Sequence, residues 1–409
     1  MSNISTLNVL LYGKQIGTIT DVGGDRSLFA FTREYIDDVN RPIVSLGFKD
    51  TLGGLITDFN ATQTKLIPFF SNLLPEGEMR NYLGERAAVN PDREFFLLWV
   101  LGQDLAGAVT VESADGEQLP PNVNDSTDEE EPQKERALRF SLAGVQLKFS
   151  AVKNASGGLT VPVNGAGGSW IVKLPSSRFE GVPENEYSMM ELARMVGIDV
   201  PETRLIDIQD IENIPGGIEK FGNSAFVIRR FDRNDDNSLV HIEDFAQIFG
   251  VRPAEKYKKA TMRRIAQVIG IEGQESDTEE FIRRLVFNAL IGNADMHLKN
   301  WSLIYKDPQI PSISPAYDFV STVPYIKDEK QALKVSKSNR FDAFSVDELT
   351  HMAAKARLPE KLVLDTARET VERFHEVWGK EKNNLALARN AIDVIEEHFK
   401  KIPLLSGKE

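Results

Sequence analysis

Residues 287–301, FNALIGNADMHLKNW, mark the point where a helical pattern gives way to a polar loop. Before them, apolar residues recur at the spacing of one helix face, which predicts a helix with one stripe against a core. The stripe consists of Phe281, Ile282, Leu285, Val286, Ala289 and Leu290. Ser276 and Glu279 have the spacing of a capping box, so we expect the helix to begin there. Gly292 suits the helix exit, where a left-handed residue is often needed.

The loop after this helix carries the residues that suggest a function. Asp295 is followed five residues later by Asn300, and Asp318 comes eighteen residues after that, directly before Phe319. In protein kinases a loop Asp accepts the proton of the substrate hydroxyl, while an Asn and a second Asp hold the Mg²⁺ ions that bridge the phosphates. Asp and Asn oxygens suit this small, hard cation. We therefore predict Asp295 as the base, Asn300 as a metal ligand and Asp318 as the main metal ligand.

Two other interpretations of the loop stay open from these residues alone. Asp and Asn are frequent in loops simply because they make good turns. A hydrolytic metal site could use Asp295 and His297 as ligands, but it would need further ligands at motif spacing. No other histidine lies within fifty residues of His297. The helix exit, the five-residue spacing and the position of Asp318 together favour phosphoryl transfer.

Composition narrows the class of protein. The chain has 409 residues, enough for two or three domains, and contains no cysteine, which excludes disulfides, Cys-ligated zinc and thiol catalysis. Lys and Arg number 48 against 61 Asp and Glu, so the net charge of −13 disfavours autonomous nucleic-acid binding. No apolar run is long enough to span a membrane, and the N-terminus lacks a signal-peptide pattern. We expect a cytoplasmic protein that a basic partner could bring to DNA.

Changes in pattern along the chain predict four parts. Residues 1–112 are predicted to form a small α+β docking subdomain, because residues 5–31 have the short alternating runs of a β-meander and two helical pieces follow. Residues 113–137 hold three Pro and an acidic run, as a linker or surface loop does. Residues 138–232 should form a β-rich lobe with a phosphate-binding loop. Residues 233–409 should form a mostly helical lobe with the catalytic loop and metal site.

Charged groups before the loop follow the order found in kinases. A small-residue turn runs from Ser141 to Lys148 between two strand-like pieces, and backbone N–H groups of such a turn can approach phosphate oxygens. A plain β-hairpin would explain the same residues. Lys173 lies in an apolar strand, and the helix that follows from about Glu184 offers Glu186. Since a kinase strand lysine pairs with phosphates and with a helix glutamate, this order supports the interpretation of the loop.

Taken together, these residues resemble the HipA family of toxin–antitoxin serine/threonine kinases. The similar segments are, in chain order, NLLPEGE, DREFFLLWVLGQDLAGAV, SLAGVQLKFS, WIVKLP, ENEY, RRFDR, IEDFAQIFG, KY, LIGNADMHLKN and SPAYDF. They span nearly the whole chain, and the DMHLKN and AYDF blocks are quite specific. The resemblance implies an α+β, bilobal protein-kinase-like fold with a small N-terminal α/β subdomain and a mostly helical C-terminal lobe.

The resemblance also implies a role for each matching residue. Asp295 corresponds to the catalytic base, Lys173 to the catalytic lysine that contacts the phosphates, and Asn300 and Asp318 to the Mg²⁺ ligands. Ser141 corresponds to the family's self-phosphorylated serine, whose modification would inactivate the kinase. The residues expected around ATP also include Ala143, Gly144, Val145, Gln146, Leu147, Lys148, Arg229, Phe231, His297 and Lys299. Phe231 would lie by the adenine, whereas Arg229 stands where the family has an acidic hinge residue.

The resemblance further implies partners. Family members use ATP and Mg²⁺ to phosphorylate a component of translation, in one branch glutamyl-tRNA synthetase. A dimeric helix-turn-helix antitoxin of the HipB type neutralises them and binds operator DNA, which would reconcile DNA association with an acidic chain. Two other functions stay open. One is a small-molecule kinase, because D-x-H-x-x-N is also the loop pattern of aminoglycoside- and choline-kinase-like enzymes. The other is a catalytically weak corepressor module.

Overall fold

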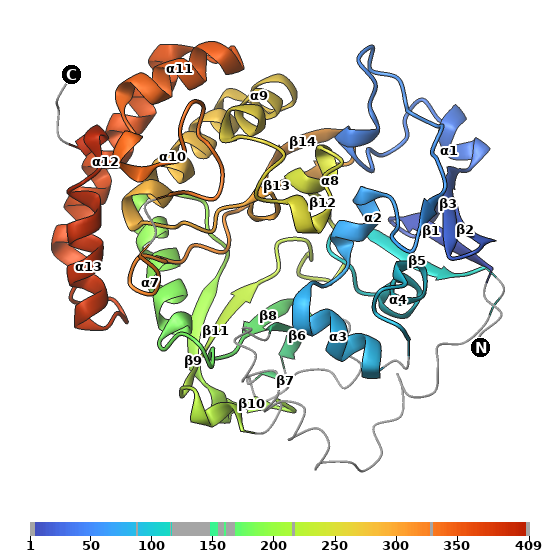
Figure 1. The fold of residues 1–409 in the computed structure, drawn as a ribbon, viewed down its shortest axis with the longest axis horizontal. Coiled ribbons are helices and arrows are strands. Elements are labelled where there is room, and N and C mark those ends of the chain that lie inside the picture. Colours follow the sequence, from blue (N-terminus) through green and yellow to red (C-terminus); the bar gives the residue numbers. More distant parts are fainter. Residues whose placement is uncertain are drawn as a thin grey trace.

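A computed structural model of the chain describes residues 5–86, 89–114, 116, 148–153, 159–160, 168–214, 217–327 and 330–405. Within these residues the strands form an N-terminal sheet, a central sheet and a small third sheet. Figure 1 shows the N-terminal sheet at one side of the molecule, the helices of the C-terminal part at the other, and the central sheet with strands β8 and β11 below the space between them.

The N-terminal sheet is antiparallel and confirms the predicted meander. Its described strands lie in the order β4 (Thr62–Gln63), β3 (Arg26–Phe31), β2 (Lys14–Gly23), β1 (Thr6–Leu11) and β5 (Val109–Ser113). Alternate residues of β1 point into a core, as the two-residue period of a strand requires. Helices α2 (Pro68–Leu73) and α4 (Glu94–Leu101) contribute aromatic residues to this core. The other helices here are α1 (Arg33–Asp37), α3 (Gly77–Arg86) and the 3-10 helix η1 (Leu46–Phe48).

The central sheet carries Lys173. Its described strands lie in the order β10 (Ile211–Glu212), β7 (Leu159–Thr160), β6 (Lys148–Lys153), β8 (Trp170–Lys173), β11 (Ser224–Arg229) and β9 (Thr203–Asp207). Lys173, at the end of β8, is paired with Lys148 on one side and Phe226 on the other. Helix α7 (Val182–Val196) packs against β9 and β11 and confirms the helix expected from about Glu184. Short 3-10 helices, η2 (Ile208–Asp210) and η3 (Ile218–Lys220), flank β10.

Helix α10 (Glu275–Ile291) is the centre of the C-terminal part. It packs against α9 (Met262–Glu272), α12 (Glu360–Glu381) and α13 (Arg389–Phe399), and every residue of the predicted apolar stripe is buried. Helix α11 (Val346–Ala356) packs on α9 and α12. The remaining short helices are α8 (Phe245–Ile248), η4 (Pro253–Glu255), η5 (Leu298–Asn300), η6 (Phe341–Ala343) and η7 (Pro403–Leu405).

The expected start of α10 is wrong, whereas its expected end is confirmed. The helix begins at Glu275 after Gln274, and Asp277 closes the capping interaction by accepting from the Gln274 backbone N at 2.7 Å. Asp277 also accepts from the backbone N of Ile313 at 2.9 Å. The cap is therefore set by this contact between the helix and a distant strand, which the spacing of Ser276 and Glu279 cannot show. Gly292 ends the helix with φ of 67°, as a left-handed cap requires.

A buried polar seam joins the N-terminal part to the rest. The third sheet, β12 (His241–Asp244), β13 (Ser302–Asp307) and β14 (Ile310–Ile313), supplies part of it. Glu243 accepts hydrogen bonds from the Ser45 hydroxyl at 2.6 Å and from the Leu46 backbone N at 2.9 Å. His241 lies between the Val44 carbonyl, 2.8 Å from Nε2, and the Ala108 backbone N, 3.4 Å from Nδ1. These contacts fix the register between the two parts.

Four buried charges extend the seam toward the central sheet. Asp104 accepts from both Arg230 and Arg233 at 2.9 Å. The same two guanidinium groups also donate to Asp232, which in addition accepts from the Gly107 backbone N at 2.9 Å. Two positive and two negative groups therefore balance one another away from water, as buried charges must.

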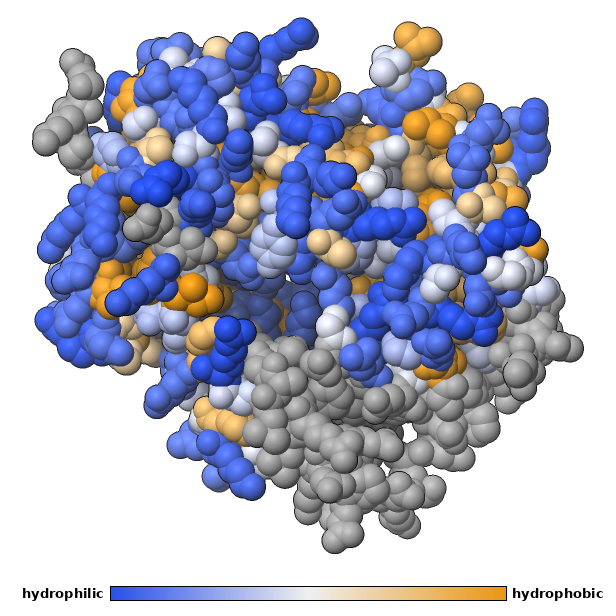
Figure 2. Space-filling view, in the orientation of Figure 1, coloured by the Kyte–Doolittle hydropathy of each residue, from blue (hydrophilic) through white to orange (hydrophobic). Residues whose placement is uncertain are grey.

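The molecular surface is largely polar on the face shown. Figure 2 shows that this face is mostly hydrophilic and is hollowed near its centre. In the described part of the chain, no helix is both long enough and apolar enough to cross a membrane.

Candidate active site

Two asparagines of the loop after α10 form hydrogen bonds with the backbone of Asp295. Asn293 accepts the backbone N–H of Asp295 at 3.0 Å, and Asn300 donates its Nδ2 to the Asp295 carbonyl at 3.0 Å. The 3-10 turn η5 then leads into β13. Asp295 is exposed, whereas Asn300 is buried behind it. The loop therefore presents a carboxylate to solvent on a backbone fixed at both ends.

Tyr257 is the direct neighbour of this carboxylate. Its hydroxyl donates to Asp295 Oδ1 at 2.7 Å, and its ring lies edge-on to His297, with 5.1 Å between the ring centroids. Desolvation by the surrounding protein raises the pKa of Asp295, and the hydrogen bond from Tyr257 opposes that rise. Asp295 Oδ2 has no such partner among the described residues, so it can accept a hydrogen bond from a substrate.

Lys173, Glu186 and Asp318, which we call the Lys173 cluster, meet beside the loop. The Lys173 ammonium donates to Glu186 Oε1 at 2.5 Å and forms a second, short ion pair with Asp318. Burial disfavours the ammonium, yet the two carboxylates together raise the pKa of Lys173. Burial also acts against the Asp318 carboxylate, but Lys173 and Lys148 lower the pKa of Asp318 to about 2. Lys173 and Asp318 are therefore charged at neutral pH, whereas burial raises the pKa of Glu186 to about 7 against the opposing charge of Lys173.

Asp318 has an unusual backbone. Its φ is 59°, in the left-handed region that a residue with a side chain rarely adopts. Its carbonyl accepts from Asn293 Nδ2 at 3.3 Å, so an asparagine of the catalytic loop holds this conformation. Such strained positions persist only where the surroundings fix them, and they concentrate at functional sites.

A second charged group, which the sequence did not reveal, includes Lys299 of the same loop. Glu76, Lys256 and Lys299 form what we call the Glu76 cluster, with Lys299 Nζ 2.8 Å from Glu76 Oε1 and Lys256 Nζ 3.0 Å from Glu76 Oε2. Burial opposes ionisation of Glu76, but the two lysines lower its pKa to about 2. Glu76 lies in NLLPEGE, which the resemblance covers but to which no chemistry had been assigned. Lys299 was predicted to lie near ATP.

His297 is buried in its neutral form. Burial, followed by the charge of Lys256, lowers the pKa of His297 to about 4. Its Nδ1 has no hydrogen-bond partner among the described residues. In that same part of the chain no three His, Asp or Glu side chains come close enough to hold a metal ion. The alternative of a hydrolytic metal site on Asp295 and His297 therefore gains no support.

The other predicted residues lie as follows. Lys148 is exposed and close enough to interact electrostatically with Asp318, Lys173 and Lys299. Phe231 follows β11. Its ring centroid lies 5.7 Å from that of Tyr317, the residue that precedes Asp318 in the sequence. Arg229 is paired with Asp235. The predicted positions Ser141, Ala143, Gly144, Val145, Gln146 and Leu147 lie outside the described residues.

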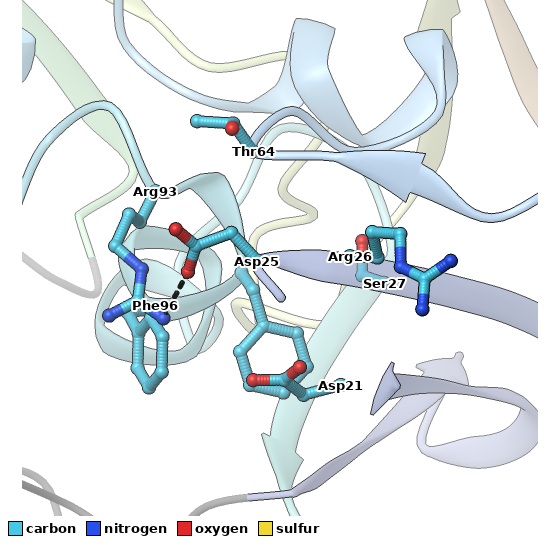
Figure 3. Close-up of a pocket in the computed structure, with 8 residues that line it drawn as sticks. Asp21, Asp25, Arg26, Ser27, Thr64, Arg93 and Phe96 are labelled. Atoms are coloured by element: carbon cyan, nitrogen blue, oxygen red, sulfur yellow. Dashed lines mark ion pairs between the residues drawn. The ribbon is translucent and has the colours of Figure 1, made fainter. Parts of the chain in front are cut away.

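A small hollow on the N-terminal part is separate from both clusters. Figure 3 shows Asp25 and Arg93 meeting across it in an ion pair of 2.5 Å, and Arg93 also lies 4.3 Å from the Phe96 ring centroid. Its lining residues are Asp21, Asp25, Arg26, Ser27, Thr64, Arg93, Phe95 and Phe96. None of them belongs to the catalytic loop.

Comparison with protein families identifies the chain. The family description "HipA N-terminal domain" matches residues 7–112, and "HipA-like C-terminal domain" matches residues 140–378. The chain belongs to the HipA family. "Putative kinase Y4dM" of Sinorhizobium fredii is 54% identical over 99% of this chain and 98% of its own. "Serine/threonine-protein kinase toxin HipA" of Shewanella oneidensis is 25% identical over 71% of this chain and 70% of its own.

A solved structure confirms the fold. The HipA chain in the complex of Shewanella oneidensis HipA, HipB and operator DNA superimposes with a TM-score of 0.73 at 21% identity, covering 98% of this chain and 96% of that one. The α+β, bilobal kinase-like fold implied by the sequence is thereby confirmed. The kinase names of the relatives support a kinase activity for this member of the HipA family.

Proposed function

We propose that this HipA-family protein is an ATP- and Mg²⁺-dependent serine/threonine protein kinase. The observation that carries the proposal is the ion pair between Lys173 of β8 and Glu186 of α7, with Asp318 on the same ammonium. In protein kinases a strand lysine must pair with a helix glutamate, and a metal-binding aspartate must be in place, before phosphate is transferred. Asp318 lies 145 residues after Lys173, and the three residues converge beside the loop that carries Asp295.

Asn300 and Asp318 suit Mg²⁺ better than a metal ion that is held by protein ligands alone. Asn300 donates through Nδ2 to the Asp295 carbonyl, so its amide oxygen is the end left for a cation. Asp318 supplies a carboxylate that stays ionised at neutral pH. Mg²⁺ is typically held by one or two carboxylates together with waters and substrate phosphates. Asn300 and Asp318 would hold it, and the bound ion would neutralise charge on the phosphate oxygens.

Asp295 would act as the base. It would accept the proton of a serine or threonine hydroxyl while that oxygen bonds to the γ-phosphorus and ADP leaves. Tyr257 occupies Oδ1 and so directs the acceptor hydroxyl to Oδ2. Proton transfer requires hydrogen-bond reach, which an exposed carboxylate on a braced loop provides.

The remaining predicted residues would bind the nucleotide. Lys173 and Lys148 would contact phosphates, with Ala143 to Leu147 forming the turn around them, and Lys299 and His297 would line the other side. Phe231 would lie by the adenine. Arg229 pairs with Asp235, so it would not replace the acidic hinge residue that the family has at this position.

The names of relatives support a toxin function. One Shewanella oneidensis relative is named a toxin, and the solved structure is of HipA with HipB and operator DNA. We therefore propose that this chain is the toxin of a type II module. Its partner would be a dimeric helix-turn-helix antitoxin of the HipB type, through which operator DNA would be reached. Its substrate would be a component of translation, with an aminoacyl-tRNA synthetase as the first candidate.

Ser141 would limit the activity. A phosphate there adds roughly −1.5 to −2 charges and three strong acceptor oxygens. It would compete for Lys148 or Lys173 and repel the phosphates of ATP, so the modified enzyme should be inactive. We expect incubation with Mg-ATP followed by phosphosite mapping to find phosphoserine at 141. If Ser141 stays unmodified while substrate phosphorylation persists, self-inhibition is wrong.

The direct test is transfer of labelled phosphate from ATP to proteins of a cell lysate. We expect labelled phosphoserine or phosphothreonine in a small set of proteins, and none with Asp295→Asn. Label found only in small metabolites would replace the protein kinase with a small-molecule kinase. ATP binding with no transfer to any acceptor would favour the corepressor module instead.

A further inference from the structure

We propose that Glu76, which the N-terminal part contributes, is a positioning residue of the active site that holds Lys299 for the phosphates. The proposal rests on the proposed kinase function and extends it to a region that has been assigned only docking. Glu76 is the last residue before α3, and it reaches two lysines that lie 180 and 223 residues further along the chain.

The segment that carries Glu76 is anchored on the C-terminal part. Asn72 donates through Nδ2 to the Val251 carbonyl at 2.8 Å, and Arg252 donates to the Leu66 carbonyl at 3.0 Å. Gly77 follows Glu76 with φ of 55°, a turn that a side chain would strain. The carboxylate is therefore presented from a fixed backbone.

Lys299 is held in a geometry that leaves one donor for a ligand. Its ammonium donates to the Asn72 carbonyl at 3.0 Å and to Glu76 Oε1 at 2.8 Å. An ammonium has three N–H donors, and among the described residues these two acceptors occupy two of them. Since Lys299 directly precedes Asn300 in the loop, the third donor would be available to a phosphate oxygen.

Glu76 also ties the loop to the residue that contacts the base. Its other oxygen, Oε2, accepts from Lys256 at 3.0 Å, and Lys256 precedes Tyr257, the hydrogen-bond donor to Asp295. One carboxylate thus fixes the spacing between the catalytic loop and the segment around η4. Because it serves two ammonium groups, the cluster keeps a net positive charge, which attracts phosphate.

This arrangement predicts opposite effects on binding and on turnover. Glu76→Gln removes a negative charge beside Lys256 and Lys299, so ATP should bind about fivefold more tightly. The Lys299 ammonium loses a strong acceptor and its fixed direction, so kcat should fall at least about tenfold. A variant that merely folded less well would lose kcat without gaining ATP affinity, so the split distinguishes positioning from structural damage.

The experiment measures ATP affinity and kcat for the full chain and five variants: Glu76→Gln, Glu76→Asp, Lys299→Met, the double variant and Glu272→Gln. Glu76→Asp keeps the charge but is too short to reach both lysines, so ATP affinity should stay near the wild-type value while kcat falls. In a Lys299→Met background, Glu76→Gln should change kcat less than twofold. The matched control is Glu272→Gln, which removes the same group from another ion pair between the two parts, Lys49–Glu272 at 2.8 Å. It should leave both constants unchanged.

Three results would overturn the proposal. Unchanged ATP affinity in Glu76→Gln would overturn it at any value of kcat. This affinity can be measured without a known acceptor. Equal losses of kcat in Glu76→Gln and Glu272→Gln would make Glu76 one docking contact among others. Wild-type kcat in Glu76→Gln, with Asp295→Asn inactive, would reject positioning while leaving the kinase function intact.

Discussion

The Lys173 cluster and the Glu76 cluster have opposite charge patterns beside the same loop. In the first, one ammonium lies between two carboxylates, and in the second, one carboxylate lies between two ammonium groups. In the first, the Asp318 carboxylate stays ionised and could hold a metal ion, and in the second, two ammonium groups share one carboxylate, which suits phosphate. A Mg²⁺ complex of ATP needs both kinds of site, and Asp295 lies on the loop beside them.

The clusters also differ in burial. The Glu186 side chain is 1% exposed and that of Lys173 is 11% exposed, whereas Asp318 is 32% exposed and Glu76 33% exposed. Removing one partner from a buried pair leaves an uncompensated charge away from water, which is costly, whereas a partly exposed pair is screened and weak. We infer that the Lys173–Glu186 pair is part of the fold itself. The Glu76 cluster is more open than this pair and can exchange protein partners for ligand.

The largest effect should come from the base that both clusters flank. Asp295→Asn should lower the transfer rate about 10²–10⁴-fold, since that is the usual cost of losing a general base. Nucleotide binding should be nearly unchanged because both clusters remain. Asp393→Asn, on the exposed face of α13, is the matched control. Unchanged transfer by purified Asp295→Asn would remove Asp295 from the site.

The next largest effect should separate the clusters by stability. Lys173→Met removes the ammonium that Glu186 and Asp318 both contact directly, so we expect the free energy of unfolding to fall by about 3–5 kcal/mol. Lys49→Met, in an exposed pair with Glu272, should cost at most about 1 kcal/mol. Urea denaturation monitored by tryptophan fluorescence measures both. Similar small losses in the two variants would contradict the assignment of the Lys173–Glu186 pair to the fold.

A smaller effect on stability should come from His241, which joins the N-terminal part to the part that carries the clusters. Burial lowers the pKa of His241 to about 4, and its Nδ1 faces the Ala108 N–H donor, so protonation would set two donors against each other. The unfolded chain binds this proton near pH 6.5 and the folded chain only near pH 4. His241 therefore contributes stability that is complete above pH 6.5 and lost as the pH falls to 4.

The expected loss over that range is about 3 kcal/mol. Burial raises the pKa of Glu243 to about 7, so that carboxyl contributes a pH dependence of opposite sign in both proteins. Urea denaturation of the wild type and His241→Gln from pH 7.5 to 4 therefore measures the loss as the change in the difference between their free energies of unfolding. Parallel pH profiles for the two proteins would mean that His241 is not buried in its neutral form.

Local patterns were sufficient to predict most of the catalytic side of the molecule. Asp295, Asn300 and Asp318 follow one another within a loop and a hairpin, and the helix exit at Gly292 is a local signal, so the sequence shows them directly. Lys173 and Glu186 could be paired because a strand and the next helix of a kinase-like lobe pack together. The roles of all five stay predictions until variants are measured.

What the sequence could not show depends on contacts between distant segments. Glu76 meets Lys299 across 223 residues, and nothing local distinguishes a carboxylate before a helix from a solvated one. Asp104 meets Arg230 across 126 residues, so the buried charges of the seam were equally hidden. The cap of α10 lies at Gln274 and Asp277, not at the expected Ser276 and Glu279, for the same reason. Ile313 of β14 supplies part of that contact.

We infer that Asp318 of the Lys173 cluster holds the metal and that Lys299 of the Glu76 cluster contacts the phosphates. The most direct test is ATP affinity with and without Mg²⁺ in the wild type, Asp318→Ala and Lys299→Met. Mg²⁺ should tighten ATP binding in the wild type, should no longer do so in Asp318→Ala, and should still do so in Lys299→Met, where ATP binds more weakly throughout. If Mg²⁺ tightens binding equally in Asp318→Ala and in the wild type, Asp318 is not a metal ligand and the division of roles between the clusters is wrong.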